Sequence, residues 1–184
     1  VDGPLDLRLN QEAGISAAER LDTISRDELA GMLYENSDEP YCEELAKAIT
    51  NEIRRGNRID TTTKLRNVIE KTLDFLPNNK EKKDIIKKTC QRTFQALRID
   101  VNNEFEVLYE FMEKLPGALK PGGRVAILTF HSGEDKLVKK ALKAGYKEGI
   151  YSEYARDVVR PSAQECAQNG RARSTKMRWA VKAE

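Results

Sequence analysis

Apolar residues recur at helical spacing from Ser16 up to Pro116. The runs AAERLDTI and RDELAGMLYEN predict two short helices. The next segment, from Tyr41 to Arg55, places apolar side chains every three or four residues, and Gly56 follows it as a good terminator. We therefore expect three packed helices before residue 57.

Two further helical patterns follow. Thr61 or Thr62 is placed to cap a helix whose apolar stripe ends at Pro77. From Lys80 the apolar spacing hardly breaks before Pro116, which predicts one long helix or two joined helices. No strand is expected in this part of the chain.

The pattern changes after a turn at residues 120–123. Residues 124–130 form a short, nearly continuous apolar run of the kind found in buried parallel strands, and a polar loop and a helix to Gly145 follow it. The remaining strand candidates are Ala155 to Arg160 and Lys176 to Lys182. The chain thus predicts an α/β fold with helices first and a βαββ pattern last. Because three strands cannot cover both faces of their own sheet, we expect missing strands or a second copy to complete it.

Composition adds little to this picture except in its charge pattern. A chain of 184 residues, 39% apolar and 34% charged, suits a helix-rich protein of one domain or two small ones. The formal net charge of +2 hides an acidic stretch at residues 35–52 and basic stretches at 80–98 and 171–184. This segregation favours an anionic partner, although charge runs are also common on solvated helix surfaces.

The cysteines and the termini bear on the compartment. Cys42, Cys90 and Cys166 stand far apart without Cys/His spacing, so we expect neither a metal site nor a disulfide framework. There is no apolar run near the roughly 20 residues of a membrane span and no leader, so a cytoplasmic location without membrane contact is expected. The sequence opens on Val1 without an initiator Met, which predicts a fragment or a trimmed terminus.

The polar loop TFHSGED lies where open α/β sheets bind ligands, at the carboxyl end of a strand. His131 is the only histidine, and it is either a catalyst or a structural hydrogen-bonding residue. Ser132 or Asp135 is equally able to cap the following helix.

Two other segments carry unusual polar groups. The irregular segment from Asp2 to Arg8 has two carboxylates, a proline and an arginine, and Asp6 is placed either to take part in chemistry or to pair with Arg8 in a turn. The segment RARSTKMRW from Arg171 to Trp179 has four cations, which suit phosphate contacts or a solvated edge strand.

Together these segments resemble the bacterial-type small-subunit (16S) ribosomal RNA cytosine-N(4)-methyltransferase family. DGPLDLRLN at the start resembles that family's DGPLDMRMD, and TFQALRI with VN and Glu104 resembles a second motif. PGGR, FHSGED and RARSTKMR resemble PGGR, FHSLED and RSRSAKLR. The chain departs from the family at Lys88-Thr89, where His-Pro is frequent, and at Gly133, Lys136 and Gly170, where Leu, Arg and Pro are usual.

The resemblance implies a Rossmann-like class I methyltransferase with an inserted all-helical domain. Residues 1–14 would be a loop of the methyltransferase domain, residues 15–90 the insert, and residues 91–184 the carboxyl-terminal part of the methyltransferase domain. The glycine-rich loop that binds S-adenosyl-L-methionine is expected upstream of Val1, so this chain alone is expected to be inactive. The implied binding partner is small-subunit ribosomal RNA or the assembled small subunit. A second copy of this chain, forming a homodimer, is a further expected partner.

The resemblance also implies roles for individual residues. Asp2, Asp6 and the carbonyls around Pro4 are candidates for accepting the protons of the cytosine amine, and His131, Ser132 and Glu134 would flank the target base or the cofactor. The implied RNA contacts are Arg8, Arg171, Arg173, Lys176 and Arg178. The alternatives are a non-catalytic RNA-binding module and a protein-interaction scaffold.

Overall fold

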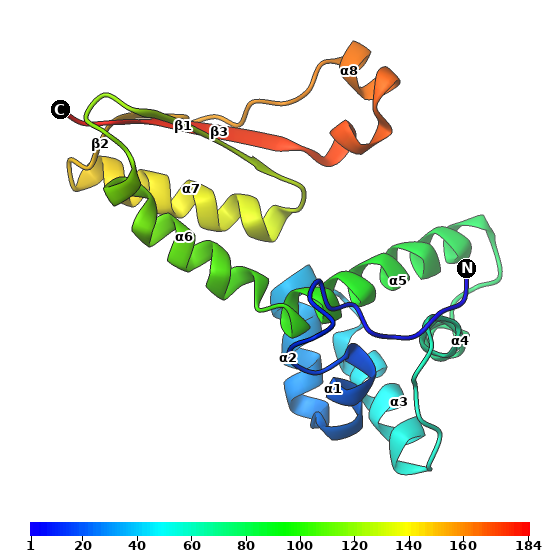
Figure 1. Ribbon diagram of the computed structural model, residues 1–184. Coiled ribbons are helices and arrows are strands. Elements are labelled where there is room, and N and C mark those ends of the chain that lie inside the picture. The colour runs from blue at the N-terminus through cyan, green and yellow to red at the C-terminus, as the bar shows by residue number, and fades with distance from the viewer. The chain divides into compact units, whose positions relative to one another are not determined.

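The computed structural model describes residues 1–184 as two compact units (Figure 1), Val1–Asn103 and Glu104–Glu184. Each unit is described by itself. This division falls after Asn103, whereas the domain boundaries expected from the sequence fall after residues 14 and 90, and that domain assignment stays a prediction. No helix in the structure combines the length and the apolar character that crossing a membrane requires.

The first unit is helical throughout. Its elements are α1 (Ala17–Thr23), α2 (Arg26–Ser37), α3 (Cys42–Arg54), α4 (Thr62–Thr72) and α5 (Lys80–Val101). The helices predicted before residue 57 are confirmed. The fourth helix is capped by Thr61 rather than Thr62, and it ends at Thr72, earlier than the expected Pro77. The long apolar stripe after Lys80 divides into two helices, since α5 ends at Val101 and a new helix begins at Glu104.

Side-chain caps explain where these helices begin. Ser16, Ser25, Thr61 and Asn79 each accept a hydrogen bond from the backbone N–H three residues later. Such a bond satisfies one of the N–H groups that the first helical turn leaves without a partner. At Ser16 the bond is reciprocal, because Glu19 accepts from the Ser16 backbone N–H.

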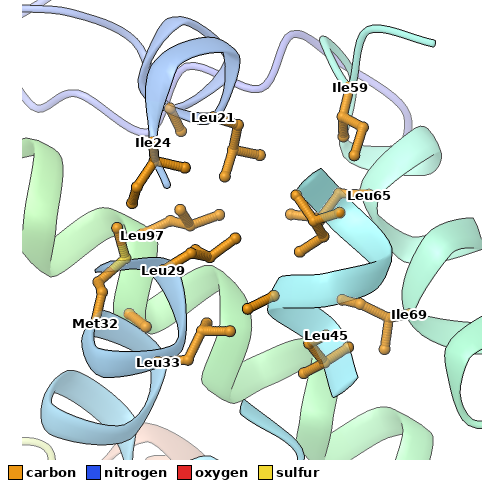
Figure 2. Close-up of a cluster of buried hydrophobic side chains, with 14 of the residues drawn as sticks. Leu21, Ile24, Leu29, Met32, Leu33, Leu45, Ile59, Leu65, Ile69 and Leu97 are labelled. Carbon is orange, nitrogen blue, oxygen red and sulfur yellow. The ribbon is translucent and has the colours of Figure 1, made fainter. Parts of the chain in front are cut away.

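The apolar faces of all five helices meet in one core (Figure 2). Leu29 and Leu33 of α2 lie against Leu97 of α5, and the cluster continues through Leu45 and Leu65 to α3 and α4. The side chains drawn there come from segments far apart in sequence. Their removal from water is the main force that holds the helices together.

The amino-terminal segment is fixed onto this helical unit. Leu5 is 1% exposed, its N–H donates to the Asp60 carbonyl at 2.9 Å, and its own carbonyl accepts from Ala18 at 2.8 Å. Farther along, the Asn102 amide donates to the Leu7 carbonyl at 2.9 Å and its oxygen accepts from the Leu9 N–H at 2.8 Å. Residues 2–9 are therefore held by helices that lie distant in sequence.

The second unit is a small antiparallel sheet with helices. Its elements are α6 (Glu104–Ala118), β1 (Arg124–Thr129), α7 (Ser132–Lys147), β2 (Tyr151–Tyr154), α8 (Ala163–Gln168), the 3-10 helix η1 (Gly170–Ser174) and β3 (Lys176–Lys182). The strand order is β1-β3-β2, and β3 pairs antiparallel with both neighbours. The α/β class and the βαββ order are confirmed.

Three expectations about this unit are wrong in detail. The run 124–130 does not pair as a parallel strand, and its side chains alternate between exposed and less exposed along β1. The strand expected from Ala155 to Arg160 lies earlier, at Tyr151–Tyr154, because the chain leaves the sheet after Tyr154 and returns only for one bridge between Val159 and Met177. The helix expected to end at Gly145 continues to Lys147.

The two faces of the sheet have different surroundings. Figure 1 shows α6 and α7 on the same face, and Val138 and Leu142 of α7 pack there with Ala180 of β3. On β1 the other face carries Leu128, which is 57% exposed and pairs in register with Met177. This face of β1 is therefore open to solvent at Leu128.

A buried ion pair joins α7 to the central strand. Nε of Arg178 on β3 donates to Oδ1 of Asp135 at 2.7 Å, and a second guanidinium nitrogen donates to Oδ2 at 3.2 Å. The remaining nitrogen approaches the carbonyl of Arg156 at 3.3 Å. The Arg178 side chain is only 6% exposed, and its guanidinium donors find their hydrogen-bond acceptors within the protein.

We predict that Arg178→Met destabilises the second unit by about 3–5 kcal/mol, because it leaves the buried Asp135 carboxylate without its main partner. Denaturant unfolding followed by circular dichroism measures this loss. Arg173→Met removes the same charge from an exposed position nearby and is the matched control, expected within about 0.5 kcal/mol of the unsubstituted chain. Equal effects of the two substitutions would contradict a special role for the pair.

The same pair predicts an acid dependence of stability. The hydrogen bonds from Arg178 hold the pKa of Asp135 below its usual value despite burial. Its contribution is therefore complete above the ordinary carboxyl pKa of about 3.9 and is lost as the pH falls through the lowered value. Unfolding free energies of the unsubstituted chain should fall below about pH 4 more steeply than those of Arg178→Met.

Candidate active site

The loop between β1 and α7 is built around a histidine cap. His131 has extended backbone angles and immediately precedes α7, and its ring Nδ1 accepts from the Glu134 N–H at 3.4 Å. In return the Glu134 carboxylate accepts from the Phe130 N–H at 3.0 Å. The cap is therefore His131, and neither Ser132 nor Asp135 takes that place.

The cap determines where the histidine proton lies. A neutral imidazole carries one proton, and Nδ1 acts as the acceptor, so the proton is on Nε2. Nε2 is shielded from solvent, has no hydrogen-bond partner, and lies 3.5 Å from Oε1 of Glu134. The Phe105 ring stands edge-on to the imidazole with centroids 5.9 Å apart. The loop thus presents a donor and a carboxylate side by side.

Glu134 remains ionised in this arrangement. Burial by itself would raise its pKa, but the adjacent imidazole of His131 and the hydrogen bond from the Phe130 N–H outweigh burial and place the pKa below its usual value. At neutral pH the loop therefore contains a negative charge next to the imidazole. This charge is suited to accept a hydrogen bond from an amine.

Glu104 joins this pair from the first residue of α6. One ligand atom of each of Glu104, His131 and Glu134 lies within 4.8 Å of the others, so these are the residues of the chain that could hold a metal ion. Binding a cation through Nε2 would require the imidazole proton to move to Nδ1, which would break the cap at Glu134. The hydrogen-bonded arrangement is therefore the more stable use of these groups.

Gly133 explains how an aromatic ring fits into this loop. A Cβ atom at Gly133 would lie 2.7 Å from the Phe105 ring and 3.2 Å from Nδ1 of His131. Phe105 thus occupies the space next to the backbone where the family motif usually has a leucine side chain. The sequence alone gave no signal that Glu104 and Phe105 reach this loop.

The amino-terminal candidates lie in the other unit and are engaged there. Both oxygens of Asp6 accept from the Arg8 guanidinium, at 2.7 and 2.9 Å, and this pairing lowers the pKa of Asp6. Arg8 also donates to the Gly14 carbonyl at 3.0 Å. The alternative in which Asp6 pairs with Arg8 in a turn is the one the structure has.

Asp2 and Pro4 differ from Asp6 in their surroundings. An oxygen of Asp2 accepts from the Thr63 N–H at 3.2 Å, and hydrogen bonds from Thr63 lower its pKa. Pro4 forms an isolated bridge with Thr61. Asp2 is exposed, whereas Asp6 is half-buried, so Asp2 keeps more of its acceptor capacity free.

The basic residues near the carboxyl terminus fall into two groups. Arg171 and Arg173 are exposed on η1, where phosphates can reach them. Lys176 is half-buried, and its Nζ lies 4.0 Å from the Asp135 carboxylate. Arg178 is buried against the same carboxylate, so the expectation that it contacts RNA does not agree with its position in this structure.

The chain is 88% identical over 184 residues to the ribosomal RNA small subunit methyltransferase H 1 of Agathobacter rectalis, covering all of this chain and 52% of that protein. It is 73% identical to the protein of the same name from Lachnoclostridium phytofermentans, covering 99% of this chain and 50% of the relative. With the ribosomal RNA small subunit methyltransferase H of Rickettsia prowazekii the identity is 36%, over 98% of this chain and 62% of the relative.

The chain spans about half the length of the first two of these relatives. The family description that matches is the MraW methylase family, and the match runs from residue 1 to residue 183. Because this match extends over nearly the whole chain, the protein belongs to the MraW methylase family.

Proposed function

We propose that this chain is part of an S-adenosylmethionine-dependent enzyme that methylates the exocyclic amine of a cytidine in small-subunit ribosomal RNA. The observation that carries the proposal is the family match over residues 1–183 together with the FHSGED loop, where an ionised carboxylate lies beside a histidine. The relatives named above support the RNA substrate, since their names describe them as small-subunit ribosomal RNA methyltransferases. We place the activity in the cytoplasm.

The proposed fold of the complete enzyme is a Rossmann-like methyltransferase domain with a helical insert. The all-helical character of α1 to α5 supports the insert, and the sheet of the second unit supports an α/β domain. The loop after β1 does not fit the cofactor. The loop after β1 has one glycine, Gly133, and a ring fills the space beside it, so it is no glycine-rich cradle.

The chemistry requires alignment and a proton acceptor. The lone pair of the cytosine amine is delocalised into the ring, so the amine is a poor nucleophile, and good alignment is worth about 7–11 kcal/mol. S-adenosylmethionine supplies the electrophilic methyl group. We assign Glu134 and Asp2 as acceptors for the amine protons, and His131 as the residue that holds Glu134 in place. Ser132, at the start of α7, would contact the base edge.

The RNA contacts are assigned to exposed cations. Arg171 and Arg173 would bind phosphates, with Lys176 beside them. The guanidinium of Arg8 is committed to Asp6, so its contribution would be to keep the amino-terminal segment in shape. A cytidine in structured RNA must leave its stack before the amine can be reached, so local opening of the RNA is part of the proposal.

We predict that the isolated chain shows no measurable binding of S-adenosylmethionine in calorimetric titration, because it has no glycine-rich turn to hold the cofactor. Adding the upstream half of a relative's sequence should restore binding and give methylated cytidine in small-subunit RNA, detected by mass spectrometry of nucleosides. Micromolar binding by the isolated chain would show that the cofactor site is placed wrongly.

In the enzyme with the upstream half restored, His131→Ala should lower kcat more than it changes RNA affinity, because the residue positions a group that acts in the transition state. The expected loss in kcat is about 10²-fold, the lower range for general acid–base groups. Asp6→Asn tests the paired carboxylate in the same assay, and Glu113→Gln on the exposed side of α6 is the control. Equal losses of turnover and affinity would instead assign His131 to folding or binding.

The double variant Arg171→Gln, Arg173→Gln should weaken RNA binding and flatten its salt dependence together. Each phosphate contact on a single strand releases about 0.7 of a counterion, so two lost contacts should lower the slope of log K against log salt by about 1.4. Fluorescence anisotropy with single-stranded RNA at several salt concentrations measures both quantities. A weaker affinity with an unchanged slope would contradict phosphate contact by η1.

A further inference from the structure

A hollow of about 360 Å³ lies on the surface of the helical unit between α3 and α4. Its wall from α3 consists of Ala48, Asn51, Glu52 and Arg55, and its wall from α4 consists of Asn67, Val68, Lys71 and Thr72. Neither the sequence motifs nor the proposed active site uses these residues. The size is in the range of small-ligand sites in proteins.

Helical spacing brings these side chains to one place. On α3 the residues 48, 51, 52 and 55 are three or four positions apart, so they lie on one face, and residues 67, 68, 71 and 72 do the same on α4. The neighbouring positions Leu45 and Leu65 point into the core and hold the two helices together (Figure 2). The hollow therefore has a rigid floor rather than a loop lining.

The polar groups of the hollow are open to a ligand. The side chains of Asn51, Asn67 and Lys71 make no hydrogen bond or ion pair within the protein. Arg55 has one long contact to Glu52 at 3.4 Å and is 67% exposed, while Asn57 satisfies the other Glu52 oxygen at 2.9 Å. Two amides, two cations and the Glu52 carboxylate, which Arg55 and Asn57 contact, thus surround a floor that contains Ala48 and Val68.

A second hollow, of about 320 Å³, flanks the same end of α3. Arg26 and Arg54 line it, and neither side chain has a partner within the protein. The carboxyl ends of helices carry partial negative charge, so these cations must supply the attraction for any anion that binds here. The α3 residues of this second hollow, Thr50, Ile53 and Arg54, lie on nearly the opposite face of the helix from Ala48, Asn51 and Glu52, so the two hollows are separate.

We propose that the hollow between α3 and α4 binds one nucleotide of single-stranded RNA, with Arg55 and Lys71 on its phosphates and Asn51 and Asn67 on its base edge. Asparagine amides offer both donors and acceptors to a base edge, which free cations alone do not. The inference rests on the proposed function for the identity of the partner as RNA, and it adds a binding site apart from the active site.

The test compares two double variants of the 184-residue chain in binding to a single-stranded RNA oligonucleotide. Arg55→Gln with Lys71→Gln should lower affinity about tenfold and reduce the salt slope by about 1.4, since two phosphate contacts are lost. The control is Lys64→Gln with Arg66→Gln, which removes the same charge from α4 at residues that pair with Asp60 and Glu70. The control should bind within about twofold of the unsubstituted chain. Equal losses in both variants would overturn the proposal.

Amide resonances test the base contact separately. Cytidine 5′-monophosphate should shift the side-chain amide signals of Asn51 and Asn67 in nuclear magnetic resonance spectra, and inorganic phosphate should leave them in place. Identical shifts with both probes would show a general anion site, and the proposed contact of Asn51 and Asn67 with the base edge would then be wrong. Absence of any shift would overturn the site as a whole, whereas methylation by the complete enzyme would still decide the proposed function.

Discussion

The second unit depends on one guanidinium group. Arg178 stands on the central strand of the sheet, and its nitrogens reach the first turn of α7 through Asp135 and the chain after β2 through the carbonyl of Arg156. Fixing that first turn also fixes Glu134 within it and His131 just before it, which together cap the start of the helix. The geometry of the candidate site thus depends on a buried pair next to His131 and Glu134 in the chain. A buried pair of this kind contributes little if both partners are absent, and a great deal if only one is lost.

The helical unit is organised by apolar burial instead of by an ion pair. Leu5 inserts into the core that α1 to α5 share, so the amino-terminal segment belongs to this core although it has no regular structure. Its carboxylates Asp2 and Asp6 are therefore placed by helices α1 and α4 and by the turn to Arg8. Residues that belong to one motif in sequence are held by packing that only the folded unit supplies.

Helix positions followed closely from the sequence because their causes are local. Apolar spacing, together with a threonine cap at the start of α4, located α1 to α5 to within a few residues, apart from the end of α4. The strand pairing did not follow, since the apolar run at residues 124–130 fits parallel and antiparallel neighbours equally well, and the choice is made by β3 far along the chain. The tail cations show the same limit. The four cations in residues 171–178 were expected to contact phosphates or to lie on a solvated strand, but Asp135, 43 residues away, holds Arg178 in the interior.

The contact between Gly133 and Phe105 links two positions that are distant in sequence. A leucine at position 133, which the family motif usually has, would meet the aromatic ring, whereas a glycine there leaves the ring room to stand against His131. Whether leucine or glycine fits at position 133 therefore depends on the residue at position 105. We expect substitutions at the two positions to have occurred together, or by way of a smaller side chain at position 105. Transfer of the usual loop into this chain would for this reason require an accompanying exchange on α6, even though nothing in the loop itself indicates it.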